Sequence, residues 1–235
     1  MDKRVTIGEA SKLLGYSIDT LRRWDRSGRL SAYRKSEGGH RYYSLSKLED
    51  FSRKLNKFRI AQKWTEAKKG FKPLPCYYCS DSFVFQSRLS RMEREMSKEK
   101  ELSDFLSLVV AVVGEIGNNS FDHNIGNWPD VPGVFFSFDL TKRKIALADR
   151  GQGVLKTLKR VRPDLSSHKE ALKVAFTEVI SGRHPEHRGN GLKFVRSAVS
   201  GTEMNLIFQT GDAELSISSG QEMEISRFKN KVMGC

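Results

Sequence analysis

The sequence has few cysteines, no long apolar run and no apolar segment at its start. Three cysteines in 235 residues are too few for a disulfide scaffold. The longest apolar stretch, residues 106–113, is far shorter than the about 20 residues that cross a membrane. The opening Met-Asp-Lys-Arg-Val-Thr-Ile lacks the apolar region of a signal peptide. We therefore expect a cytoplasmic protein with no membrane partner.

Positive charge is abundant and unevenly distributed. The net charge is +13, from 41 basic and 28 acidic side chains. Residues 1–75 contain 19 basic and 8 acidic side chains, a net +11, whereas the rest contains 22 and 20, a net +2. This asymmetry is typical of a polyanion-binding module joined to a near-neutral domain. Lysine, glycine and proline between residues 68 and 75 indicate a linker. We predict domains at 1–66 and 86–235, joined by residues 67–85.

The first domain has the pattern of two short helices and an extended loop. Ile7, Ala10 and Leu14 lie on one helical face, and Gly15 ends that helix. Ser17 is a candidate N-cap for a second helix that turns Leu21 and Trp24 inward. Two short helices around a glycine turn predict a helix-turn-helix. A further helix is expected over residues 45–64.

The outer face of the second helix and the loop after it carry residues suited to DNA. Arginine binds guanine edges and phosphates, and small hydroxyl side chains bind either. The paired glycines Gly38 and Gly39 between aromatic-rich arms favour a wing. The candidate DNA-binding residues are Ser17, Thr20, Arg22, Arg23, Arg26, Arg34, Lys35, His40, Arg41 and Tyr42.

Three segments carry a resemblance over about 60 residues. They are Ile7-Gly-Glu-Ala-Ser-Lys-Leu-Leu-Gly-Tyr-Ser, Thr20-Leu-Arg-Arg-Trp-Asp-Arg-Ser-Gly-Arg-Leu and His40-Arg-Tyr-Tyr-Ser. Together they resemble the winged helix-turn-helix of MerR-type regulators, and especially the head that precedes some serine recombinases. The resemblance implies sequence-selective, usually dimeric binding of double-stranded DNA. The alternative is a protein-interaction domain. No recombinase domain follows.

The second domain combines long helices with strands. Apolar residues recur at helical spacing from residue 86 to Ile116, and Glu115 and Asn119 share a helix face. Strands are expected over 134–140 and 145–148, and again near 204–209 and 214–218. Asp149-Arg-Gly-Gln-Gly153 follows a strand, and His187-Arg-Gly-Asn-Gly-Leu-Lys193 opens a helix. A glycine-rich helix start presents N–H groups to phosphate. The fold class expected for the chain is α+β.

The ordered set of motifs resembles the GHKL ATP-binding fold, an α/β sandwich. Glu115-Ile-Gly-Asn-Asn119 is similar to its N-box, Asp149-x-Gly151-x-Gly153 to its adenine box, and Gly189-x-Gly191-Leu192 to its phosphate-lid box. The resemblance implies an ATPase in which Glu115 is the general base and Asn119 coordinates Mg²⁺. Asp149 would accept a hydrogen bond from the adenine amino group, and the glycines would approach base and phosphates.

The resemblance also implies a lid and shows two departures. Residues 154–188 would form a mobile lid, from which Arg183, His187 or Arg188 could reach the phosphates. Relatives place a threonine on the final strand beside the adenine aspartate, and here Ala213 is expected there, with Thr210 nearby. No histidine occurs in residues 86–114, which disfavours an autophosphorylating histidine kinase.

Two questions stay open at this point. Cys76-Tyr-Tyr-Cys79 is half of a zinc site, so either a zinc site shared between two subunits or two partly buried thiols would explain it. The leading functional hypothesis is a homodimeric DNA-binding regulator of transcription gated by Mg-ATP. The alternatives are a kinase or anti-sigma-like switch acting on a partner protein, for which His123 has a counterpart in anti-sigma kinases, and an ATPase acting on DNA structure.

Overall fold

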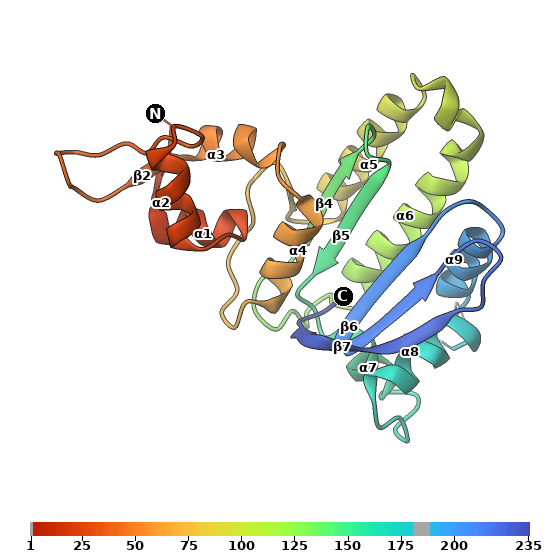
Figure 1. Cartoon of the computed structure of the whole chain (residues 1–235). Helices are drawn as coiled ribbons and strands as arrows, with labels where there is room; N and C mark the ends of the chain where they lie inside the picture. The colour runs from red at the N-terminus through yellow and green to blue at the C-terminus, as the bar shows by residue number, and fades with distance from the viewer. Residues whose placement is uncertain (1, 181–188) are drawn as a thin grey trace. The chain divides into compact units, whose positions relative to one another are not determined.

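The computed structural model describes residues 2–180 and 189–235. The chain divides into two compact units, residues 1–78 and 79–235, whose elements are labelled in Figure 1. The division falls within the segment expected as a linker. Residues 71–77 of that segment pack against the first unit. Leu74 and Tyr77 are buried, and Trp64 Nε1 donates a hydrogen bond to Phe71 O at 2.6 Å.

The first unit is a cluster of short helices with a two-stranded ribbon. Strand β1 (Arg4–Thr6) pairs antiparallel with β2 (Tyr42–Ser44). Helix α1 (Ile7–Leu14) begins with a capping box between Thr6 and Glu9, which satisfies N–H groups that the first turn leaves unpaired. Gly15, at φ 71°, ends α1, and Ser17 caps α2 (Ile18–Arg26).

The helix expected over residues 45–64 is two helices, so that prediction was wrong. Helix α3 (Leu45–Ser52) ends at Arg53, and Asn56 caps α4 (Lys57–Glu66) by accepting a hydrogen bond from Arg59 N at 3.3 Å. The break turns α4 so that Ile60 and Trp64 are buried. Apolar spacing alone conceals such a break, because both helices keep the same period.

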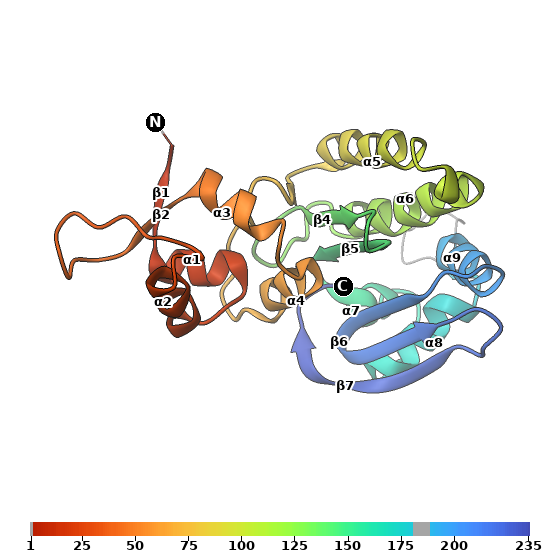
Figure 2. The same ribbon diagram turned by 45° about the horizontal axis from the view of Figure 1, so that its top comes forward.

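The second unit begins with two helices that pack on a small sheet. Helix α5 (Ser82–Met96) is followed by the 3₁₀ helix η1 (Lys100–Phe105) and by α6 (Leu106–Asp122). Strands β4 (Val134–Asp139) and β5 (Lys144–Asp149) form a hairpin, with the short β3 (Tyr78–Cys79) beside β4. Figures 1 and 2 show α5 and α6 lying along this hairpin. Phe85, Met92, Phe121 and Phe136 fill the space between them.

A second hairpin and three helices complete the unit. Strand β6 (Leu206–Ile217) pairs antiparallel with β7 (Glu224–Val232). Helices α7 (Gly153–Leu158), α8 (His168–Thr177) and α9 (Gly191–Ser200) precede this hairpin along the chain. Helices α8 and α9 pack on β6, and α9 also packs on α6. A core that includes Leu172, Phe176, Val195 and Leu215 lies between these elements.

Two expectations for this unit differ from the structure. The two strands expected near 204–209 and 214–218 are one strand, β6, because Gly211, at φ 57°, forms a bulge rather than a turn. The lid expected over 154–188 is largely helical and packed, since Leu158, Leu165, Ala171 and Leu172 are buried in the core. Residues 181–188 of that lid lie outside the described residues.

Helices and strands coexist in the second unit and the first is mainly helical, which confirms the α+β class. Across residues 2–180 and 189–235, no helix combines the length and apolar character that crossing a membrane requires.

Candidate functional site

Three arginines lie on the exposed face of α2, and two of them form no ion pair with the described residues. Arg22, Arg23 and Arg26 are all exposed. Arg22 Nη1 lies 3.0 Å from Asp19 Oδ1, whereas Arg23 and Arg26 have no ion pair within the described part of the chain. Ser17 Oγ accepts a hydrogen bond from Thr20 N at 3.2 Å, so Ser17 already has a structural role as the helix cap. Arg23 and Arg26 are therefore the strongest candidates on this helix for DNA contact.

The loop after α2 is a closed wing. Tyr33 and Tyr42 form an isolated β-bridge, with backbone hydrogen bonds of 2.8 and 2.9 Å. Gly38, at φ 75°, lies near the tip of the loop between them, in a conformation that glycine adopts without strain. Lys35 and His40 are exposed on this loop, as expected for side chains that reach the phosphate backbone.

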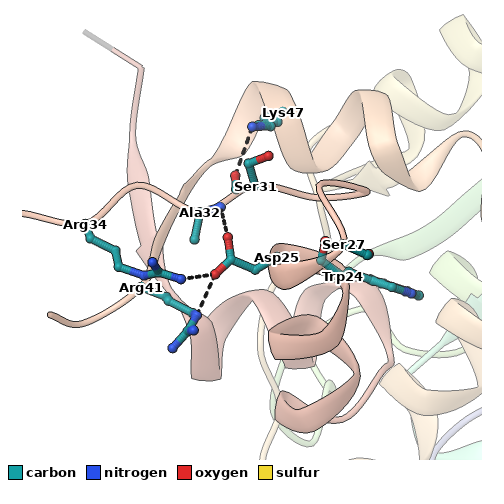
Figure 3. A network of polar contacts seen from close by, with 8 residues as sticks. All are labelled: Trp24, Asp25, Ser27, Ser31, Ala32, Arg34, Arg41 and Lys47. Atoms are coloured by element: carbon teal, nitrogen blue, oxygen red, sulfur yellow. Dashed lines mark hydrogen bonds and ion pairs between the residues drawn. The ribbon is translucent and has the colours of Figure 1, made fainter. Parts of the chain in front are cut away.

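A buried carboxylate fastens the wing to α2 (Figure 3). Asp25, whose side chain is 7% exposed, accepts a hydrogen bond from Ala32 N at 2.8 Å and from Arg41 Nε at 2.7 Å, and it pairs with Arg34 as well. Lys47 Nζ donates to Ser31 O at 2.9 Å in the same region. The wing is thus held at both of its arms by one residue of α2.

The electrostatic balance at Asp25 favours the charged form. Burial alone raises the pKa of Asp25, but the Ala32 N–H and the guanidinium groups of Arg41 and Arg34 more than offset it, so the pKa lies below its ordinary value. Two arginines around one carboxylate leave one net positive charge. The expectation that Arg34 and Arg41 serve as phosphate ligands is therefore modified: in this structure both also bind Asp25, and positioning of the wing is their first role.

Replacing Asp25 with Asn should destabilise the first unit by about 1–3 kcal/mol at neutral pH, because two partly buried guanidinium groups lose their partner. Since the folded-state pKa is lowered, the stabilisation is present above the unfolded pKa and is lost in acid as Asp25 itself becomes protonated. Urea unfolding followed by the fluorescence of Trp24 and Trp64 measures the difference. The matched control is Asp19→Asn on the same helix, whose ion pair is exposed. An equal loss in both variants would contradict this role of Asp25.

The second unit contains a cavity of about 600 Å³, within the usual size range of small-molecule sites. Most of its lining comes from the C-terminal part of α6, the end of β5, α7 and the N-terminus of α9, with further residues from α8, β6 and the segment that ends at Cys235. Seven of the predicted site residues line it: Glu115, Asn119, Asp149, Gly153, Gly189, Gly191 and Leu192. Gly151 lies just outside the lining, and Arg188 lies outside the described residues.

Asp149 forms a buried part of the cavity wall. Its side chain is 2% exposed and accepts a hydrogen bond from Gly151 N at 2.7 Å. Burial raises the pKa of Asp149 to about 6, against hydrogen bonds from Gly151 and Ser120 that lower it. A buried carboxylate at the wall of a cavity is an acceptor suited to a ligand N–H group.

Another part of the lining brings Glu115 and Asn119 of α6 together with Gly191 of α9, more than 70 residues further along the chain. Asn119 Nδ2 donates to Glu115 Oε1 at 2.9 Å, which leaves Asn119 Oδ1 as an oxygen ligand. A Cβ atom added to Gly191 would lie 1.6 Å from the same Glu115 Oε1. The carboxylate of Glu115 therefore lies against the first residue of α9, and any larger residue at position 191 would have to displace it.

The glycines of the predicted motifs have different roles. A Cβ atom on Gly151 would lie 2.1 Å from Asn124 Nδ2, so the absence of a side chain at Gly151 accommodates Asn124 rather than a ligand. Asn124 Oδ1 accepts a hydrogen bond from Gln152 N at 2.8 Å. Gly153 has φ 74°, and its backbone lines the cavity. The expectation that both glycines approach the base is thus unsupported for Gly151.

The two positions considered for a threonine beside Asp149, Ala213 and Thr210, are both buried residues of β6. Thr210 is fully buried. Val154 N donates to its hydroxyl at 3.3 Å, and the hydroxyl donates to Gly234 O at 2.9 Å. Thr210 therefore lies directly behind the turn that carries Gly153.

Two further lining residues, Cys235 and Lys193, escaped the sequence predictions. Cys235 O accepts a hydrogen bond from Asp149 N at 2.8 Å, and burial beside Asp149 raises the pKa of its thiol. The residues that follow Lys193 have the apolar spacing of a helix that packs on a core. That spacing predicts the buried face of α9 but gives no indication that Lys193 lines a cavity. Its only sequence signal was its place two residues after Gly191.

The remaining cysteines are not arranged for metal binding in this chain. Cys79 lies in the core among apolar side chains, and burial raises the pKa of its thiol to about 11. Cys76 N donates to Glu49 Oε1 at 3.0 Å. Within residues 2–180 and 189–235, no group of three or more His, Cys, Asp or Glu side chains is placed to hold a metal ion.

Comparison with known proteins identifies the N-terminal unit. Residues 6–43 match the family described as MerR family regulatory protein, which confirms the predicted helix-turn-helix DNA-binding domain. The type II methyltransferase M.Eco47II of Escherichia coli is 30% identical to the chain over 69 residues. That segment covers 29% of this chain and 16% of the relative, so the chain spans less than a fifth of that protein. No solved structure matches the chain.

Proposed function

We propose that this MerR-type DNA-binding protein binds Mg-ATP in the cavity of its second unit, and that nucleotide binding or hydrolysis gates its DNA binding or dimerisation. The observation that carries the proposal is the convergence of Asp149, Asn119, Glu115 and the Gly189–Gly191 turn on one cavity. These residues come from three separate stretches of the sequence. Each has the chemistry that one part of the nucleotide requires.

The lining contains residues whose chemistry matches the base and residues whose chemistry matches the phosphates of a nucleotide. The buried Asp149 carboxylate would accept the hydrogen bond of the adenine amino group. The N–H groups at the start of α9, in the same lining, would bind phosphate oxygens, since a helix N-terminus favours anions. Asn119 Oδ1 is the hard oxygen ligand that Mg²⁺ prefers. Bound Mg²⁺ would neutralise phosphate charge.

Glu115 is the candidate catalytic residue. Its carboxylate lies between Asn119 and Gly191, where it would orient the attacking water and accept its proton. The hydrogen bond from Asn119 Nδ2 holds one carboxylate oxygen and leaves the other for the water. The proposed activity is therefore slow, Mg-dependent ATP hydrolysis, with Glu115 dispensable for binding.

Gating is tested by measuring DNA affinity at fixed salt, because phosphate contacts make affinity depend steeply on salt. The probe is a labelled duplex selected by the protein from a random-sequence pool, titrated without nucleotide, with Mg-ATP and with Mg-ADP. We expect at least a tenfold difference between two of these states, equal to about 1.4 kcal/mol of coupling. Asn119→Ala should abolish it, and the control Asn127→Ala, outside the cavity, should not.

Equal DNA affinity in all three states, together with measurable ATP binding, would refute gating. A second function would then be favoured, because His123 and Asp122 line the cavity at the end of the helix that carries Glu115. That function is transfer of the terminal phosphate to a partner protein. It predicts that label from γ-labelled ATP is retained on a protein rather than released as inorganic phosphate.

A further inference from the structure

The charges that line the cavity are unbalanced. Glu115, Asp122 and Asp149 contribute three carboxyl groups to the wall. Among the described lining residues, Lys193 is the only lysine or arginine. Among the described lining residues, a polyphosphate in this cavity would meet the carboxyl groups of α6 and β5 and one ammonium group on α9.

Lys193 occupies a position that is unfavourable for a cation in the ligand-free chain. It is the third residue of α9, whose first turn contains no acidic residue and whose Asn190 N-cap makes no side-chain capping bond. The N-terminal end of a helix carries partial positive charge, so a lysine there is disfavoured. Helix propensity and capping therefore give no reason for a lysine at this place.

The surroundings of Lys193 do not compensate for this placement. Burial lowers the pKa of Lys193, and the nearby Glu178 only partly opposes that effect. Glu178 is itself engaged by Arg162, with 2.8 Å between Nη1 and Oε2. Within the described part of the chain, Lys193 has no ion pair. An anion bound between Lys193 and the α9 N–H groups would relieve both unfavourable effects.

Lys193 lines the same cavity as the candidate catalytic residue Glu115. Gly191, at the start of the helix that carries Lys193, lies against the Glu115 carboxylate. If Glu115 activates the attacking water, the terminal phosphate must lie beside it, close to Gly191 and Lys193. Asp149, the proposed adenine acceptor, lies at the end of β5, to which neither Gly191 nor Lys193 belongs. We propose that Lys193 binds the terminal phosphate and makes the cavity selective for nucleoside triphosphate over diphosphate; this inference rests on the proposed function.

The test is calorimetric titration of the full chain with Mg-ATP and Mg-ADP. Wild-type protein should bind Mg-ATP at least tenfold more tightly than Mg-ADP. Lys193→Ala and Lys193→Gln should reduce that preference to less than threefold by weakening ATP binding, with ADP binding changed less than twofold. Lys193→Arg should retain most of the preference. The matched control is Arg196→Ala, which removes an exposed positive charge from the same helix outside the lining.

Each outcome has a distinct meaning. An unchanged ATP preference in Lys193→Ala, an equal loss of both nucleotides, or a wild-type protein that binds both equally would overturn the role of Lys193. Absence of any nucleotide binding by wild-type protein would instead overturn the proposed function. Thermal unfolding distinguishes a lysine that binds phosphate from one that only stabilises the fold. If Lys193 binds phosphate, its variants should unfold at the same temperature as wild type or higher.

Discussion

Replacing Asp149 with Asn should make the protein more stable and at the same time defective in nucleotide binding. Asp149 is almost completely buried, and burial raises its pKa to about 6 from the ordinary value of 3.8. Compared with the unfolded chain, the folded chain therefore favours the protonated form of Asp149 over the charged form. Asn has the same shape and preserves an acceptor for Gly151 N without the charge.

The pH dependence of this effect follows from the direction of the shift. Below pH 3.8 the carboxyl is protonated in both the folded and the unfolded chain, so it imposes no penalty. As pH rises towards 6, only the unfolded chain ionises, and the free energy of unfolding falls. Above pH 6 the penalty is constant, at about 3 kcal/mol for a shift of this size.

Calorimetric unfolding of the full chain at pH 7 and pH 4 measures the stability change. Asp149→Asn should raise the free energy of unfolding by up to about 3 kcal/mol at pH 7 and change it little at pH 4. Asp104→Asn, an exposed aspartate of the same unit, is the control and should have no comparable effect. A variant less stable than wild type at pH 7 would show that Asp149 contributes structurally through its charge.

The same substitution should weaken Mg-ATP binding by about 10- to 100-fold, since hydrogen bonds to charged groups contribute about 1.5–3 kcal/mol. In wild type, ATP affinity should also fall as pH drops below about 6, as Asp149 gains a proton. Titration at pH 5.5, 6.5 and 7.5 tests this, and Asp149→Asn should lose that dependence. Unchanged ATP affinity in the variant would remove Asp149 from the nucleotide site.

The helices of the first unit were predictable because local and tertiary signals agree there. Ser17 and Gly15 start and stop helices by their own backbone and side-chain chemistry, and the apolar spacing of Leu21 and Trp24 matches their burial. The division between α3 and α4 was not predictable, because Leu55 continues the apolar period across the break. Asp25 was also missed, since its partners lie 7 to 16 residues away.

For the cavity, the sequence motifs predicted some of the lining residues and not others. Short motifs identified Glu115, Asn119, Asp149, Gly153 and Gly191, because polar and glycine residues stand out against an apolar helix or strand. The Gly211 bulge, a backbone feature that spacing along the chain does not reveal, joins Thr210 and Ala213 in one strand, in which the Thr210 hydroxyl accepts a hydrogen bond from Val154 N. Asn124 and Lys193 reach their positions through packing between elements, which spacing along the chain does not encode.

Removing Arg23 and Arg26 together should have the largest effect on DNA binding. Both are exposed on α2, neither has an ion pair within the described residues, and the MerR family match spans this helix. A bidentate arginine–guanine contact contributes about 1–3 kcal/mol of discrimination, whereas a phosphate contact adds about one unit to the salt slope. We expect the Arg23→Ala, Arg26→Ala double variant to bind the selected duplex about 100-fold more weakly, in line with two such contacts.

The measurement is a salt series on the selected duplex and on a scrambled duplex of the same length. Loss on the selected duplex alone would assign the arginines to bases, and equal loss on both with a shallower salt slope would assign them to phosphates. The control removes two basic residues from the second unit, Arg94→Ala with Lys98→Ala, and should change affinity less than threefold. Equal weakening by both double variants would mean that net charge, rather than α2, drives DNA binding.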